Sequence, residues 1–169
     1  MVIKLSEMKF MVGNGFLVSS MLNRKFWMYD FDLNTWSTRG VERMPVKLIV
    51  PGHAFYPQHD SVIFVGGGVH PTVAVNTVIT YSVRDNSYDD SNQYLKDMPS
   101  AHRGPFCYAD RGNLYAFGGM TSDGVHSNFS YMLRPSGNWE RMGDVPSAAG
   151  HMNGFAVNLT KYVELGGGV

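Results

Sequence analysis

The sequence is poor in the features that mark disulfide-rich, nucleic-acid-binding and membrane-spanning proteins. It holds one cysteine, Cys107, among 169 residues. A single cysteine forms no internal disulfide, so an oxidising compartment is not indicated and we expect a cytoplasmic protein. Lysine plus arginine and aspartate plus glutamate balance at 14 each, and the absence of a basic stripe gives no support for nucleic-acid binding. No run approaches the roughly 20 apolar residues of a membrane helix, and no signal-peptide pattern opens the chain.

Motifs of the common enzyme and metal-binding classes are also missing. There is no nucleophile elbow, phosphate loop or His/Glu-rich metal motif. The glycines at 66–68 follow a strand-like run, but no helix-like run comes after them, which argues against a dinucleotide site. His53, His102 and His151 are spaced by 49 and 49 residues, yet they occupy different places relative to the glycine pairs, and no pair has structural zinc spacing. We therefore expect no metal and no cofactor.

Glycine and aromatic residues, in contrast, are plentiful, with 19 Gly, 10 Phe, 9 Tyr and 3 Trp. Many of them recur in one pattern, a short apolar run that ends in glycine. The first glycine of each run stands at 13, 66, 118 and 166, so the steps are 53, 52 and 48 residues. A period near 50 is typical of an array of supersecondary units. The glycine pairs of the last three runs are Gly66-Gly67, Gly118-Gly119 and Gly166-Gly167.

Three further landmarks follow each glycine in the same order. A strand-like run ends in tyrosine, a large aromatic comes seven or eight residues later, and a proline opens the next unit. Each landmark keeps a step of about 50 residues through three cycles. The tyrosines are Tyr29, Tyr81 and Tyr131, the aromatics are Trp36, Tyr88 and Trp139, and the prolines are Pro45, Pro99 and Pro146.

Each landmark has a physical reason, and together the landmarks predict one unit of about four strands. Apolar runs of four to six residues are typical of strands. A glycine pair after a strand allows a sharp bend and a close approach of backbones. The Asp- and Asn-rich segments 30–36 and 84–88 and the segment 134–139 are expected hairpin turns. The aromatic after each turn has the area to cover a neighbouring sheet, so adjacent units should pack face to face.

This ordered set resembles the Kelch repeat family over roughly residues 9–169. The resemblance implies an all-β fold: a Kelch-type β-propeller in which each repeat is a blade of four antiparallel strands around a central channel. Two positions depart from the family pattern. Gly13-Asn14 lacks the second glycine, and Tyr88 stands where the family usually has Trp. A polar insertion at 89–97 is a third departure.

The repeats divide the chain into units at about 1–44, 45–98 and 99–145, with an incomplete unit at 146–169. We expect these to form a single partial propeller with no second domain. Propellers have four to eight blades, so about three and a half form an incomplete ring. The missing blades would come from the rest of a longer chain or from further copies of this one.

Within these units, the pattern predicts strands but no helix of useful length. Loops are expected at 69–75 and 121–128, and an exposed polar loop at 89–93. A tight hairpin is expected at 110–113. Strands are expected at 2–5, 26–29, 35–38, 53–56, 61–65, 77–83 and 105–109.

Binding is the function that this architecture favours. Loops on a rigid scaffold carry binding residues, and the start of each inner strand should face the channel. That placement nominates Arg103 first, then His53, His102, His151 and Asn153. The planar guanidinium of Arg103 would bind a carboxylate, so the expected partner is a protein or peptide segment with acidic character. Packing against nearby backbone is the alternative role for these side chains.

A catalytic role is the second hypothesis, because some Kelch-type propellers are enzymes. Examples in the family are galactose-oxidase-like copper proteins and sialic acid epimerases. The copper class needs a cysteine joined to a tyrosine. Cys107 and Tyr108 are adjacent, so on a strand they point to opposite faces. We therefore expect binding rather than catalysis, with part of a carbohydrate-active or oxidase propeller as the alternative.

Overall fold

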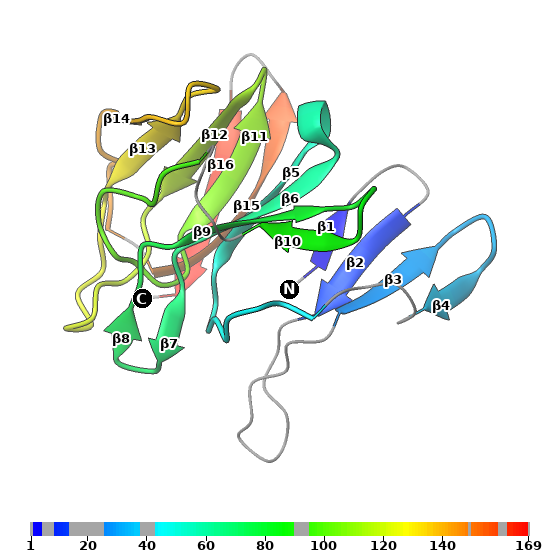
Figure 1. The fold of residues 1–169 in the computed structure, drawn as a ribbon. Helices are drawn as coiled ribbons and strands as arrows, with labels where there is room; N and C mark the ends of the chain where they lie inside the picture. The colour runs from blue at the N-terminus through cyan, green and yellow to red at the C-terminus, as the bar shows by residue number, and fades with distance from the viewer. Residues whose placement is uncertain are drawn as a thin grey trace.

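The computed structural model describes residues 2–4, 9–13, 26–37, 43–89, 95–148, 150–158 and 162–168. Within this part of the chain every element is a β-strand except one 3-10 turn, Pro57–His59 (Figure 1). The strands form antiparallel sheets of two or four strands. The all-β prediction is therefore confirmed. Leu5, Asn14, Thr38 and the predicted polar loop after Asp89 lie outside the described residues.

Sheet one is a four-stranded meander in which chain neighbours pair. Its strands are β1 (Val2–Lys4), β2 (Lys9–Gly13), β3 (Phe26–Asp30) and β4 (Thr35–Ser37), in that spatial order. The tight turn between β3 and β4 forms because the Asp30 carboxylate accepts hydrogen bonds from the backbone N–H groups that follow it.

Sheet two repeats this meander. Its strands are β5 (Gly52–Tyr56), β6 (Ser61–Val65), β9 (Val78–Ser82) and β10 (Ser87–Asp89), in the spatial order β5-β6-β9-β10. All four strands lie where the sequence predicts strands or a hairpin. The 3-10 turn joins β5 to β6 and ends at Asp60.

Sheet three is the third meander, and a two-stranded sheet follows it. The second strand of sheet three starts at Asn113, directly after a two-residue turn at Arg111 and Gly112 in which both φ angles are positive. This is the hairpin that the sequence predicts. The strands of sheet three are β11 (Phe106–Asp110), β12 (Asn113–Phe117), β13 (Ser130–Leu133) and β14 (Trp139–Arg141). The last sheet pairs β15 (Gly150–Asn158) with β16 (Tyr162–Gly168).

Two details differ from the sequence-based expectation. The segment 69–75, expected as a loop, contains a small hairpin of β7 (Gly68–His70) and β8 (Val73–Ala74). This hairpin is held in place because Gly68 also pairs with Ile49. The second difference is at the chain's last glycine pair, where β16 continues to Gly168 instead of ending before Gly166.

The first two glycine pairs bend the chain sharply at the ends of β6 and β12. Gly66 and Gly67 have φ of +61° and +100°, and Gly118 and Gly119 have φ of +60° and +98°. These left-handed values favour glycine over any residue with a Cβ. The bends also bring backbones together, since a Cβ on Gly66 would lie 2.5 Å from the carbonyl oxygen of His102.

Sheets pack face to face along the chain, and their first strands are neighbours. Strand β5 contacts β1 and β11, and β11 contacts β15. All five residues of β6 are buried, because its side chains alternate between two faces and each face packs into a core. Val62 and Phe64 enter the core shared with sheet one, whereas Ile63 and Val65 enter the core shared with sheet three.

Candidate functional site

The predicted residues His102 and Arg103 lie on a segment that passes between the two glycine bends. The N–H of Gly67 donates to the carbonyl of His102 at 2.8 Å. Arg103 and Met120 exchange two backbone hydrogen bonds of 2.8 Å each. The N–H of Gly104 donates to the carbonyl of Val50, also at 2.8 Å. This segment is therefore fixed to both glycine bends and to the residues that precede β5.

His102 is a buried residue, not a surface contact. Its side chain is 4 % exposed, and its ring lies 4.1 Å from the ring centroid of Phe129. The Nδ1 atom lies 3.3 Å from the hydroxyl of Ser100. Burial lowers the pKa of His102 below its ordinary value, with a smaller contribution from the charge of Arg141, while a hydrogen bond to the Ser100 backbone opposes the shift. The neutral ring packs between sheets and offers no cation to a partner.

Arg103 is the unusual side chain of this region. The residue is 8 % exposed, and its Nε is buried with no hydrogen-bond partner. No other described residue hydrogen-bonds or ion-pairs with its guanidinium. Its Cδ lies only 2.8 Å from where a Cβ on Gly68 would stand, so the stem depends on that glycine for space.

Arg103 is the one buried arginine among the described residues, and three of the exposed or half-exposed arginines, Arg111, Arg134 and Arg141, have acidic partners. Arg134 donates to Glu140 from both Nε and Nη2, at 3.0 Å and 2.7 Å. Arg141 forms an ion pair with Asp144. Both arginines are about half exposed, where an ion pair contributes little. A buried guanidinium without a carboxylate is costly, so the Arg103 site is chemically suited to take an anion.

The remaining predicted binding residues lie on strands β5 and β15. His53 is half-buried on β5, where it pairs with Phe64 of β6. Asn153 pairs with Gly166 in the β15–β16 ladder, and His151 lies on the same strand. The side chains of His151 and Asn153 lie outside the described part of the chain. The structure thus brings His102 and Arg103 together on one segment, whereas it places His53 on β5 and both His151 and Asn153 on β15.

The three predicted aromatic landmarks occupy different environments. Tyr81 and Tyr88 are cross-strand partners in the core shared with sheet one. Trp139 packs edge-on against Tyr131, and its indole N–H donates to the carbonyl of Lys96 at 2.8 Å. Trp36 differs from them, since it is 56 % exposed and no other described sheet packs on it.

Trp36 is exposed because it lies on the open face of sheet one. Phe26 and Met28 of β3 point to sheet two, so their neighbour Tyr29 points to the opposite side. Trp36 pairs with Tyr29 across the ladder, with ring centroids 5.0 Å apart. No described element covers this face.

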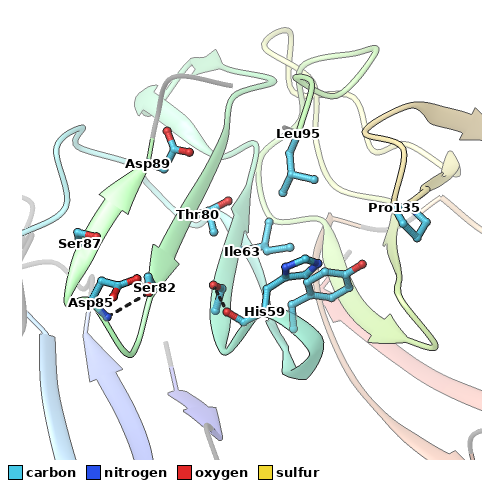
Figure 2. Close-up of a pocket in the computed structure, with 11 residues that line it drawn as sticks. His59, Ile63, Thr80, Ser82, Asp85, Ser87, Asp89, Leu95 and Pro135 are labelled. Atoms are coloured by element: carbon cyan, nitrogen blue, oxygen red, sulfur yellow. Dashed lines mark hydrogen bonds between the residues drawn. The ribbon is translucent and has the colours of Figure 1, made fainter. Parts of the chain in front are cut away.

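A pocket that the sequence did not predict lies between sheets two and three. Its volume is about 530 Å³, within the range of small-molecule sites. Its floor is the face of sheet two that looks toward sheet three (Figure 2). The lining residues are Tyr56, His59, Ser61, Ile63, Thr80, Ser82, Asp85, Ser87, Asp89, Leu95 and Pro135.

Strand register explains the polar floor of this pocket. Ser61, Ser82 and Ser87 stand in one row across β6, β9 and β10. Ile63, Thr80 and Asp89 form the next row. Since the rows share a face, they bring residues from three strands together, and no local sequence signal shows it. The alternation of Ile79 and Tyr81 with the polar Thr80 and Ser82 along β9 is the sequence signal for this polar face.

Neither a metal centre nor a reactive thiol is formed by the described residues. No group of three or more His, Cys, Asp or Glu side chains among them is placed to hold a metal ion. Cys107 is buried, and desolvation raises the pKa of its thiol well above the ordinary range. It packs beside Gly52 as a small core residue.

Comparisons with known proteins support the fold and go no further. A scan of the sequence against protein-family models finds no match, and a search of curated proteins finds none. Solved structures do match, and YjhT is one of them. The likeness covers 83 % of this chain and 44 % of YjhT, with a TM-score of 0.65 and 13 % sequence identity. The chain thus spans less than half the length of YjhT. No helix in the described ranges is long and apolar enough to cross a membrane.

Proposed function

We propose that the chain is part of a Kelch-type β-propeller that acts as a protein-interaction module, with Arg103 binding an acidic partner segment. The observation that carries the proposal is the buried guanidinium of Arg103, which has no acidic partner among the described residues. A carboxylate from a partner would compensate this charge through hydrogen bonds to the Nη groups. We place the module in the cytoplasm, because its one cysteine is buried and no disulfide is needed for folding.

Three consecutive meanders support the propeller part of the proposal. Each has four antiparallel strands in chain order, and the first strands of successive sheets are in contact. This is the arrangement of propeller blades whose inner strands line a central channel. The glycine bends then lie at one end of the inner strands, beside Arg103.

Apolar side chains near Arg103 would add to the affinity of an acidic segment. The β7–β8 hairpin begins at Gly68, which the Arg103 stem touches. Val69 and Val73 of this hairpin are 47 % and 44 % exposed. Exposed aliphatic side chains beside a charged anchor suit a partner in which the acidic residue is flanked by apolar ones.

The missing blades remain part of the proposal. The open face of sheet one, with Trp27, Tyr29 and Trp36, corresponds to the face that the preceding sheet covers in sheets two and three. A further sheet of the same kind would bury these rings. Light scattering of the purified chain distinguishes the sources: a discrete dimer supports completion by copies, and aggregated or poorly folded material supports completion by a longer chain. A stable folded monomer would contradict the need for further blades.

The test of the binding site is fluorescence anisotropy with a labelled peptide that carries two glutamates between leucines. Replacing Arg103 with Met keeps the apolar stem and removes the charge. We expect more than tenfold weaker binding, since a hydrogen bond to a charged group contributes about 1.5–3 kcal/mol. Arg134→Met, which removes an exposed arginine already paired with Glu140, is the matched control. Equal affinity for the wild type and Arg103→Met would refute the proposal, and turnover of a sugar by the chain would favour the enzymatic alternative.

A further inference from the structure

The pocket between sheets two and three is a second site with the opposite charge preference. Among the described residues that line it, the charged side chains are the carboxylates of Asp85 and Asp89, and none is a lysine or arginine. We propose that this pocket binds an organic cation, a guanidinium or ammonium group on an aliphatic stem. The proposal is independent of the binding role of Arg103, which does not line the pocket.

Two hydrogen bonds hold Asp85 in place at the pocket's edge. The hydroxyl of Ser82 donates to the Asp85 carboxylate at 2.7 Å. The same hydroxyl oxygen accepts a hydrogen bond from the backbone N–H of Asp85 at 3.1 Å. A carboxylate fixed in this way loses little side-chain freedom when a cation binds, which lowers the cost of binding. Figure 2 shows Asp85 and Ser82 joined at one side of the floor and Asp89 above them.

Contacts between the two sheets preserve the shape of the opposite wall. The rings of Tyr56 and His59 are stacked, with centroids 5.0 Å apart and planes at 13°. The Tyr56 hydroxyl donates to the carbonyl of Gly112 in the β11–β12 turn. Pro135 closes the same corner, since its Cγ lies 3.5 Å from the Cβ position of Gly112. The wall is therefore attached to both sheets and is formed in advance of binding.

This combination favours a cation with an aliphatic stem over other ligands. An anion would face the carboxylates of Asp85 and Asp89, and no described lining residue is a lysine or arginine that would attract it. Ile63, Leu95 and Pro135 provide apolar surface for a methylene stem. The hydroxyls of Thr80 and Ser87 accept hydrogen bonds from N–H donors. A planar guanidinium also stacks on an aromatic ring, and the exposed ring of His59 offers one.

The experiment is a titration of the full chain with agmatine. Binding is monitored through the NMR chemical shifts of the His59 ring and, separately, by calorimetry. We expect saturable binding that weakens at high salt, because both carboxylates are exposed and screened. Asp85→Asn should weaken binding about three- to fivefold, as expected for an exposed ion pair. The double variant Asp85→Asn/Asp89→Asn should reduce it about tenfold or more if the two contributions add.

The matched control is Asp123→Asn, which removes a similar exposed aspartate. Asp123 accepts a hydrogen bond from the hydroxyl of Thr121, as Asp85 does from Ser82, but it lies outside the pocket. This variant should bind agmatine like the wild type. No agmatine binding, or equal binding by the double variant, overturns the proposal.

A second comparison identifies the source of the cation. An Ala-Arg-Ala peptide with blocked ends is titrated beside agmatine, and the same peptide with citrulline in place of arginine is the neutral control. Tighter binding of the arginine peptide assigns the pocket to a basic segment of a protein, and equal binding assigns it to the cationic group alone. Binding of the citrulline peptide as tight as that of the arginine peptide contradicts a charge-selective site.

Discussion

Replacing Arg103 with Met should stabilise the fold while it removes the proposed binding site. In the folded chain the Arg103 Nε is buried without a partner, and an unsatisfied buried donor costs about 1–3 kcal/mol. Methionine keeps two methylenes of the stem and places its terminal methyl near the position of Nε, so most packing is retained. The free energy of unfolding should therefore rise by about 1–3 kcal/mol.

Thermal unfolding followed by circular dichroism measures this change. For a chain of this size each kcal/mol raises Tm by about 2–4 °C. Arg134→Met is the control, because its exposed ion pair with Glu140 contributes little, and its Tm should stay near that of the wild type. A lower Tm for Arg103→Met would refute the reasoning, since it would mean that the buried guanidinium already has a stabilising partner. Higher stability together with lost peptide binding is the pattern of a functional site that costs stability.

Three further predictions concern the structure around Arg103 and the pocket. Gly119→Ala should lower the free energy of unfolding by more than Gly124→Ala: both have positive φ, but only at Gly119 would the new Cβ meet backbone, 2.8 Å from the Arg103 carbonyl oxygen; equal losses in urea titrations would contradict the contact. Because the pKa of His102 is lowered in the folded chain, this histidine takes up a proton at a higher pH in the unfolded chain than in the folded one. Stability should therefore fall as pH drops below about 6.5, the ordinary pKa of histidine. His102→Gln should flatten this dependence, and an unchanged pH profile would show that His102 is not responsible. Tyr56→Phe removes the hydrogen bond to Gly112 and should cost about 1 kcal/mol in chemical denaturation; a neutral effect would mean that this bond does not hold the two sheets together.

Much of the fold could be predicted because its signals are local. Strand positions follow from short apolar runs, and the structure places β6, β9 and β11 within a residue of the prediction. The Arg111-Gly112 turn follows from residues that tolerate positive φ. The β7–β8 hairpin was missed because its two strands are only three and two residues long, and Gly68 is held by the distant Ile49.

The candidate site could be predicted only in part, because burial depends on distant residues. Spacing placed Arg103 at the start of an inner strand, but it could not show that His102 beside it packs on Phe129. The same limit applies to Trp36, whose repeat position matches that of Tyr88 although its face of sheet one has no described cover.

The sequence by itself determined which segments form strands, where the chain turns and that these units recur about every 50 residues, since propensity and glycine conformation act within a few residues. Tertiary structure alone decided which polar groups meet. No carboxylate among the described residues pairs with the Arg103 guanidinium, and Asp85 and Asp89 share a pocket with Tyr56 of another strand. Side chains alternate between faces, so the charge and shape of a face depend on how strands align across a sheet and which sheet lies opposite.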